Sequence, residues 1–235
     1  MTRDSGEVPG PDDSRDDPAT EARAAVAETV RNLGHALVEH RPGPELLARV
    51  RERIAALLPE IEAAPARTTA DLEARHARFF AAIDDAMTAT SAAEDGALDL
   101  LPESIVSGRL NPLGVGLRIA REGEEVVGRV QLGPAHEGPP GRAHGGIVSA
   151  MVDEAMTYVL GVVGAFGYTG RLSITFLAPT PVGEELELRA RLRERDGRKL
   201  IIECTGTHGT TRFVEAEGLF VAVDASAVTS PEVAP

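Results

Sequence analysis

Residues Gly146 to about Val163 read GIVSAMVDEAMTYVLGVV, a segment that is long enough for a helix and apolar nearly all round. Such a helix has no polar face to turn toward water, so other elements of the chain must enclose it. The segment nevertheless contains two adjacent acids, Asp153 and Glu154. The fold therefore has to surround this helix and also provide partners or a function for two carboxyl groups.

The segments around this helix show the two-residue alternation of strands. Asp196-Gly197 separates two of them and is a strong signal for a two-residue hairpin. We expect an α+β fold in which about five or six mostly antiparallel strands wrap around one central helix. The expected strands cover residues 114–120, 125–132, 171–178, 184–195, 199–208 and 218–223.

Composition divides the chain into four regions. Residues 1–18 are acidic and nearly devoid of apolar side chains, which predicts a disordered tail. Residues 19–95 carry apolar side chains at helical spacing, which predicts an extension of three amphipathic helices that caps the main domain or a partner subunit. The main domain is expected at residues 105–224, followed by a C-terminal tail at residues 225–235.

Charge and cysteine content narrow the choice of partners and compartment. A net charge of −13 repels phosphate backbones, so nucleic acid is not an expected partner. No apolar run is long enough to cross a bilayer, and the N-terminal residues lack the basic start and apolar stretch of a secretory signal. Together with a single cysteine, Cys204, these features predict a cytoplasmic protein without a membrane partner.

Three motifs carry a resemblance to a known family: HGGIVSAMVDEAM at residues 144–156, NPLGVGL at 111–117 and TGRLSITFLAPTPVGEEL at 169–186. Over residues 105–224 the chain resembles the hotdog-fold acyl-CoA thioesterases of the phenylacetic-acid-degradation type. The resemblance implies an enzyme that hydrolyses an acyl-CoA thioester to free acid and coenzyme A without a metal or redox cofactor. It also implies a homodimer or a dimer of dimers.

Two other functions are compatible with the same fold. A hotdog domain can bind acyl-CoA or another acyl ligand without turnover, for instance as a regulatory subunit. A hydratase or dehydratase would be expected to use a differently placed Asp-His pair. The acid on the helix favours catalysis.

The start of the predicted helix has the features of an oxyanion hole. Gly145 and Gly146 lie where backbone N–H groups have no intrahelical acceptor, at the positive end of the helix dipole. Because glycine has no side chain, a substrate carbonyl can approach these amides, which can polarise a thioester and hold the oxyanion formed when water attacks. The alternative is that the two glycines only form a tight turn into the helix.

Asp153 is the residue that we expect to activate the water as a general base, or to attack the thioester directly as a nucleophile. A hydrogen-bonded structural acid is the alternative. The resemblance selects Asp153 over Glu154 and implies that His144 orients the loop before the helix and that Thr169 helps to place the water. Glu154 then either points to a subunit interface or lines a polar end of the pocket.

The remaining candidates concern the substrate. Tyr158 is expected to line the acyl pocket, which is either an aryl slot or an aliphatic tunnel. Arg191 and Arg193 share one strand face and could meet the phosphates of coenzyme A, although a solvated strand face explains them equally well. The family often has an amide side chain six residues before the histidine, and here that position is Gly138. The amide side chain that could act as a second polarising donor is therefore missing at this position.

The sequence favours neither a cysteine nucleophile nor a metal site. Cys204 and His208 could share a strand face and form a nucleophilic pair, but a small buried cysteine in a core strand is the better interpretation. No histidine pair has the spacing of metal ligands, so we expect no metal site.

Helix geometry separates the two expected catalytic groups. At about 1.5 Å per residue, Asp153 lies roughly 12 Å along the helix axis from the amide of Gly145. One thioester carbon cannot contact both groups, and the chain offers only one such helix. We therefore expect a two-fold dimer with antiparallel central helices and two composite sites.

Overall fold

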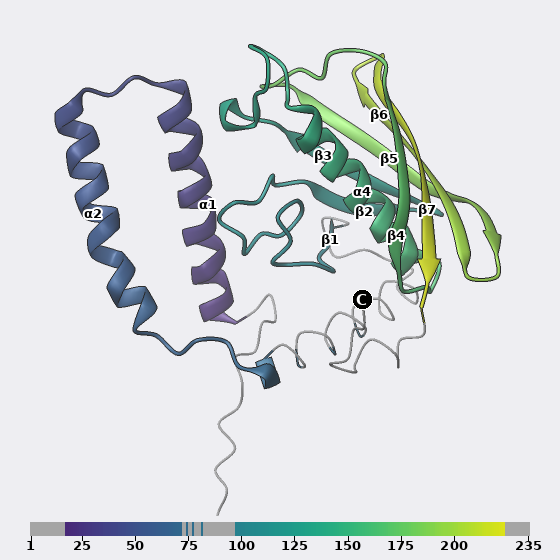
Figure 1. Ribbon diagram of the computed structural model, residues 1–235, viewed down its shortest axis with the longest axis horizontal. Coiled ribbons are helices and arrows are strands. Elements are labelled where there is room, and N and C mark those ends of the chain that lie inside the picture. The colour runs from purple at the N-terminus through teal and green to yellow at the C-terminus, as the bar shows by residue number, and fades with distance from the viewer. Residues whose placement is uncertain (1–16, 72–73, 75–76, 78–80, 82–96, 224–235) are drawn as a thin grey trace, which may run out of the picture.

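The computed structural model describes residues 17–71, 74, 77, 81 and 97–223 (Figure 1). The tail expected at residues 1–18 lies outside the described residues except for its last two, and the tail expected at residues 225–235 lies wholly outside them. Among the described helices, none has both the length and the hydropathy needed to cross a membrane.

Two helices of the N-terminal extension are described. Helix α1 covers Pro18–Glu39 and α2 covers Pro44–Glu62, and each has a proline at its start, where a missing N–H leaves no helical bond unmade. The Asp17 side chain caps α1 by accepting the N–H of Thr20 at 3.1 Å. Of the third expected helix, residues 69–71, 74, 77 and 81 are helical, and its other positions lie outside the described residues.

The rest of the described chain forms one sheet and the helix that it encloses. The sheet has seven strands in the order β1-β2-β3-β5-β6-β7-β4, and all neighbouring strands are antiparallel. The expected antiparallel sheet around one helix is confirmed, with the two-residue β1 as an additional strand. The elements are β1 (Ala97–Leu98), β2 (Arg118–Glu122), β3 (Glu125–Gln131), the short 3-10 helix η1 (Pro134–His136), α4 (Gly145–Val162), β4 (Gly167–Phe176), β5 (Glu185–Asp196), β6 (Lys199–His208) and β7 (Thr211–Ala222).

Three strand boundaries differ from the sequence-based expectation. The strand expected at 171–178 begins at Gly167 and ends at Phe176, because its pairing with β7 extends to Ala222. The first strand, expected at 114–120, begins only at Arg118, because the backbone just before it bonds to the loop at residues 105–106 instead. The last strand, expected at 218–223, begins at Thr211, because the hairpin with β6 pairs that whole segment.

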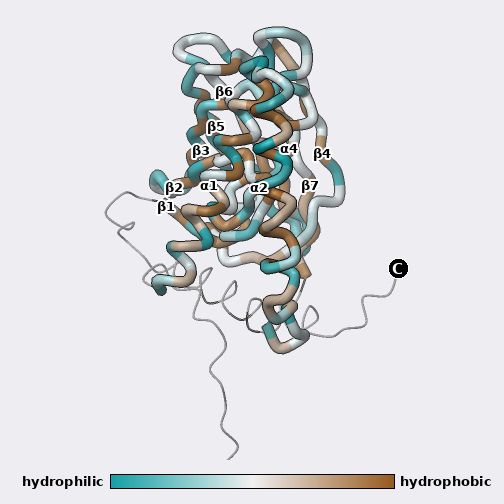
Figure 2. Tube along the Cα trace, turned by 90° about the vertical axis from the view of Figure 1, so that its left-hand side faces the viewer, coloured by the Kyte–Doolittle hydropathy of each residue, from teal (hydrophilic) through white to brown (hydrophobic). Residues whose placement is uncertain are grey.

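Helix α4 packs against one face of the sheet (Figure 1), and Figure 2 shows hydrophobic and hydrophilic stretches alternating along the helices and strands. The side chains of α4 that face the sheet are fully buried, as are their partners on β5, β6 and β7. This confirms that the apolar helix is enclosed. The buried residues include Met151, Val152, Ala155, Met156 and Val159 of α4 and Leu186, Leu188, Ile202 and Phe220 of the sheet.

The two N-terminal helices relate differently to this domain. Helix α1 packs against η1 and, through Arg31, donates to the carbonyl oxygen of Asn111 at 2.6 Å. Helix α2 lies beyond α1 (Figure 1) and has no buried residue. Its apolar stripe is exposed, and it comprises Leu46, Leu47, Ile54, Leu57, Leu58 and Ile61.

Two glycines in the β5–β6–β7 part of the sheet are required for different reasons, one by a turn and the other by close packing. The expected hairpin is confirmed, but its two turn residues are Gly197 and Arg198, because Asp196 still pairs with Lys199. Gly197 has a φ of 55°, which suits the first central position of a tight hairpin turn. Gly206 lies on the buried face of β6, where an added Cβ would come within 2.6 Å of side-chain atoms of Phe213 and Val214. The inner face of the sheet therefore leaves no space for a methyl group at this position.

We expect Gly206→Ala to lower the free energy of unfolding by about 1–3 kcal/mol, the usual range for overpacking a well-filled core. Gly34→Ala in α1 is the matched control, because a Cβ there meets nothing within 4 Å and alanine favours a helix. Urea unfolding followed by circular dichroism measures both variants. A Gly206→Ala protein as stable as the parent would show that the sheet is loosely packed here.

Candidate active site

The start of α4 presents one free backbone amide. His144 is the N-cap, and its Nδ1 accepts the N–H of Gly146 at 3.0 Å. The N–H of Gly145 makes no hydrogen bond to any residue that the structure describes, and Gly145 is exposed at the positive end of the helix dipole. Of the two glycines expected to polarise a substrate, Gly145 thus has an available N–H, whereas the N–H of Gly146 is already bonded.

A groove of about 440 Å³ opens beside this amide. Phe176, at the end of β4, also lines this groove, and an added Cβ at Gly145 would be 3.5 Å from Phe176 Cζ. A larger side chain at position 145 would fill the approach to the amide. The groove is lined by Pro139, Arg142, Ala143, Gly145, Val148, Phe176, Leu177, Ala178, Pro179 and Thr180.

Asp153 lies midway along α4 and faces β4. The hydroxyl of Thr169 donates to Asp153 Oδ1 at 2.8 Å. The other carboxyl oxygen, Oδ2, has no hydrogen-bond partner within the part of the chain that the structure describes. Two residues expected to share the chemistry are therefore in direct contact, and one oxygen of the half-buried carboxyl is left available.

A β-bulge in β4 directs Thr169 toward the helix. Thr169 pairs with Phe220, while the next paired residue of β4 is Arg171, so Gly170 is the extra residue. Directly paired residues project from the same face of a sheet. Since Phe220 is fully buried against α4, the side chain of Thr169 also points inward, where it meets Asp153.

Glu154 points in a different direction and has partners of its own. Its Oε1 accepts the hydroxyl of Ser107 at 2.5 Å and the N–H of Ser107 at 3.3 Å. The hydroxyl of Tyr158 lies 3.0 Å from Ser107 Oγ and accepts the N–H of Leu101 at 3.3 Å. Burial raises the pKa of Tyr158 above its usual range. This cluster ties α4 to the loop before β2, and it also borders a cavity of only about 20 Å³, room for little more than one water.

The expected site residues thus form two groups. His144, Gly145 and Gly146 meet at the start of α4, and Asp153 meets Thr169 further along the same helix. At about 1.5 Å per residue, the two groups are roughly 12 Å apart along the axis, so one chain does not bring them to a common point.

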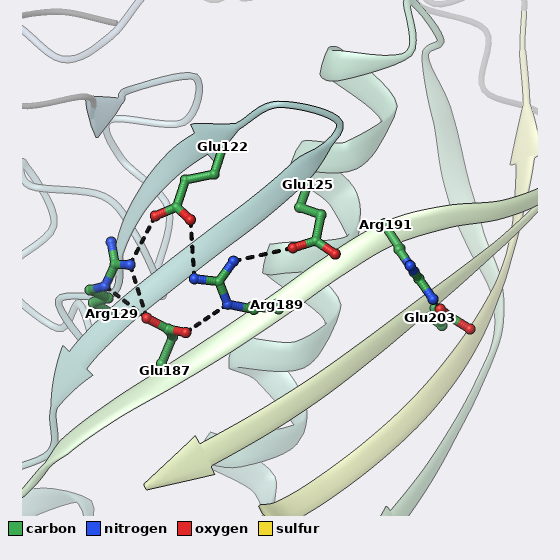
Figure 3. Close-up of polar contacts among 7 residues, drawn as sticks. All are labelled: Glu122, Glu125, Arg129, Glu187, Arg189, Arg191 and Glu203. Atoms are coloured by element: carbon green, nitrogen blue, oxygen red, sulfur yellow. Dashed lines mark hydrogen bonds and ion pairs between the residues drawn. The ribbon is translucent and has the colours of Figure 1, made fainter. Parts of the chain in front are cut away.

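The two arginines proposed for coenzyme A already have carboxylate partners on the outer face of the sheet. Arg191 Nε lies 2.6 Å from Glu203, directly across on β6 (Figure 3), and Arg193 reaches Glu217 of β7 at 2.6 Å. Glu203 raises the pKa of the Arg191 guanidinium. A phosphate at this position would have to compete with these carboxylates.

Gly138, the position at which the family often has an amide, packs closely on the N-cap histidine. A Cβ at Gly138 would lie 3.1 Å from the Cα of His144. A side chain there would press on the residue that caps α4. Ser107, which the sequence analysis did not identify, supplies the partner of Glu154, and no local signal marks a serine that lies 47 residues away from that acid.

Cys204 and His208 do not form a reactive pair in this structure. The Cys204 thiol is buried on the inner face of β6, and burial raises its pKa to about 12. His208 Nδ1 lies 3.2 Å from the carbonyl oxygen of Glu185. Within the described residues, no group of three or more His, Cys, Asp or Glu side chains is arranged to hold a metal ion.

We expect the Cys204 thiol to stay protonated and unreactive at pH 8, because its pKa lies far above that value. Labelling with a disulfide reagent such as DTNB should therefore be slow for the folded protein and fast in concentrated urea. Labelling of the folded protein at the rate of a free thiol would show that β6 opens readily.

An antiparallel sheet wrapped around one buried helix defines a hotdog fold, and structural comparison confirms it. A solved structure described as a thioesterase superfamily protein matches with a TM-score of 0.70 and 25% identity. The match covers 91% of this chain and 93% of that one, so it includes the N-terminal helices as well as the sheet.

Sequence comparison points to thioesterases. Residues 140–215 match the model of the Thioesterase superfamily. Acyl-coenzyme A thioesterase THEM4 from Bos taurus is 35% identical over 96 residues, which are 40% of this chain and 39% of that protein. Acyl-coenzyme A thioesterase 13 from Mus musculus is 26% identical over 97 residues, 40% of this chain and 69% of that protein. The chain thus spans less than half of the length of THEM4.

Proposed function

We propose that this protein is an acyl-CoA thioesterase that hydrolyses its substrate to a free acid and coenzyme A. The observation that carries the proposal is the Asp153 carboxyl on the enclosed helix, bonded by Thr169 at one oxygen and open at the other. The available N–H of Gly145 supplies the complementary polarising group. The match to the Thioesterase superfamily model and the names of THEM4 and acyl-coenzyme A thioesterase 13 support the reaction and the substrate class.

In the proposed mechanism, the thioester carbonyl oxygen accepts a hydrogen bond from the N–H of Gly145. Asp153 Oδ2 accepts a proton from a water molecule, whose oxygen attacks the carbonyl carbon. The amide of Gly145 holds the oxyanion that results, an interaction worth about 3–4 kcal/mol in other oxyanion holes. The carbon–sulfur bond then breaks, and the coenzyme A thiolate takes the proton held by Asp153. Thr169 keeps Oδ1 occupied and so presents Oδ2 to the water.

The two catalytic groups meet in this proposal through a second copy of the chain. Strand β4 pairs with β7 on one side only, and its other edge is unpaired within the described residues. Thr169, with Asp153 beside it, lies near one end of β4, and Phe176, with Gly145 beside it, forms the other end. Antiparallel pairing of two β4 edges about a two-fold axis would bring each Asp153 toward Gly145 of the partner subunit. Each dimer would then contain two composite sites.

Within the thioesterases, we place the chain in the phenylacetic-acid-degradation type, because the His144-Gly145-Gly146 start and Asp153 have the spacing of that type. Acyl-CoA binding without turnover is the second candidate function. It is favoured by Gly138, since the side-chain donor often found at this position is missing. Release of free thiol from a panel of acyl-CoA substrates distinguishes the two candidates, and it also separates aryl from aliphatic acyl groups.

We expect Asp153→Asn to lower kcat by about 10²- to 10⁴-fold, because the amide retains the size of the side chain but cannot accept the proton. The unfolding temperature should stay unchanged, since the asparagine oxygen can still accept the hydroxyl of Thr169. Asp196→Asn, at the exposed end of β5, is the matched control and should retain the parental rate. Parental turnover in Asp153→Asn would remove Asp153 from the mechanism.

The composite site predicts complementation between two inactive variants. Asp153→Ala and Gly145→Leu should each be inactive alone, because the first lacks the base and the second blocks the approach to the amide. In a mixed dimer, one site carries both lesions and the other carries neither, so random pairing should restore about a quarter of the parental activity. The two variants are coexpressed with different tags, and thioester hydrolysis is measured. Purification through both tags in turn selects the mixed dimers, whose expected activity is about half of the parental activity. Purified mixed dimers without activity would contradict the composite site.

A further inference from the structure

The N-terminal helix α1 contacts the loop that leads into the oxyanion hole. His35 of α1 accepts the N–H of Ala135 at 3.1 Å through its Nδ1 atom. Its ring stands edge-on to the ring of His136, with the centroids 4.7 Å apart. Gly133 makes room for this contact, since an added Cβ would lie 2.5 Å from the His35 ring. His35 of the helical extension thus packs on the 3-10 turn η1 and is hydrogen-bonded to it.

The η1 segment is also hydrogen-bonded to His144, the residue that caps α4. The carbonyl oxygen of His136 accepts the N–H of His144 at 2.9 Å. Within the same segment, Gly138 donates to the carbonyl oxygen of Arg142 at 2.9 Å, which closes residues 136–144 into a hairpin-like loop. Since His144 then accepts the N–H of Gly146, an unbroken series of contacts runs from His35 to the first turn of α4.

We propose that His35 is a positioning residue that holds the loop of residues 133–144 so that the N–H of Gly145 points at the substrate carbonyl. This rests on the function proposed above. His35 touches neither the substrate nor the reacting atoms and acts only through η1 and His144. The helical extension would thus serve catalysis by fixing one half of the site.

A second attachment of α1 allows the role of His35 to be tested separately. Arg31 binds the carbonyl oxygen of Asn111, in a different loop, one helical turn before His35. Because this bond and the ion pair between Glu21 and Arg109 are independent of His35, a change at His35 should loosen η1 while α1 stays docked.

The hydrogen bonds that the His35 and His136 rings accept require both rings to be neutral, so acid should break these bonds. Both Nδ1 atoms act as acceptors, that of His35 from Ala135 and that of His136 from Gly133 at 3.3 Å, and a protonated Nδ1 cannot accept. Burial, with a smaller contribution from His35, lowers the pKa of His136 to about 4. A histidine with a lowered pKa in the folded protein stabilises the docked state above the unfolded value of about 6.5. That contribution is lost as the pH falls from about 6.5 toward 4.

The charged groups near His35 and His136 do not offset this loss of stability at low pH. Arg31 and Glu39 lie one turn to either side of His35 on α1, and Glu137 follows His136. Arg31 is bonded to the carbonyl oxygen of Asn111, and Glu137 accepts the N–H of Gly141 at 3.2 Å. Neither histidine ring has an ion-pair partner among the residues that the structure describes.

The test compares His35→Ala, His35→Asn and His40→Ala in the full-length protein. His35→Ala removes the acceptor, whereas the asparagine oxygen can take the place of Nδ1. His40 lies just after α1 with 70% of its side chain exposed, so His40→Ala is the control. We expect His35→Ala to lower kcat by about 5- to 100-fold with KM little changed, the effect of a misplaced oxyanion donor. His35→Asn should restore most of kcat, and His40→Ala should match the parent.

Hydrogen exchange of the amides in residues 133–146 provides a readout independent of turnover. His35→Ala should speed exchange in this segment at pH 7, and the parent should show the same increase as the pH is lowered from 6.5 to 4, after correction for intrinsic exchange rates. Unchanged exchange in His35→Ala would overturn the proposal, as would faster exchange with an unchanged kcat. If the parent hydrolyses no thioester, the proposed function fails, and the exchange data alone decide whether His35 holds the loop.

Discussion

The burial of an all-apolar helix inside a single sheet governs the rest of this structure. Each fully buried aliphatic side chain of α4, such as Met151 or Val159, contributes about 1.5–3 kcal/mol by leaving water. A buried carboxyl group without a partner would oppose this by an amount of the same order, about 1–3 kcal/mol or more. The helix can therefore hold Asp153 and Glu154 only where each has a hydrogen-bond donor or access to solvent.

The two acids meet this requirement in different ways because neighbouring helical residues point about 100° apart. Glu154 turns to the loop before β2 and is bonded twice by Ser107, which makes it part of the packing of α4. Asp153 turns to β4, where Thr169 satisfies one oxygen and the other stays open. The hydrogen bonds from Ser107 to Glu154 help to fix the rotation of α4 about its own axis, and this rotation turns Asp153 toward β4.

The position of β4 explains why the proposed site needs two chains. Strand β4 follows α4 directly in sequence but pairs only with β7, so it becomes an edge of the sheet. Gly145 and Asp153 both lie along this strand, at opposite ends. A sheet edge of ten residues with an open row of backbone groups favours pairing with another strand. The proposed dimer would satisfy that edge and complete both sites with the same interface.

Local signals explain how much of this could be predicted from the sequence. The apolar α4, the alternation of β5 and β6 and the hairpin at Gly197 are properties of neighbouring residues, and these elements were predicted to within a residue or two. The free N–H of Gly145 follows equally from helix geometry. Contacts between distant residues left no such signal: Ser107 lies 47 residues from Glu154, and His35 lies 100 residues from Ala135. The partners of Arg191 and Arg193 likewise depend on strand register and on a bulge in β5.

In the proposed dimer, one thioester is held between the amide of Gly145 in one chain and the carboxyl of Asp153 in the other. The most direct measurement is a crystal structure of the Asp153→Asn protein with an intact acyl-CoA substrate bound. We expect the thioester carbonyl oxygen within hydrogen-bond distance of the Gly145 N–H of one subunit, with position 153 of the partner subunit facing the carbonyl carbon. A thioester bound away from Gly145, or enclosed by residues of a single chain, would contradict this arrangement.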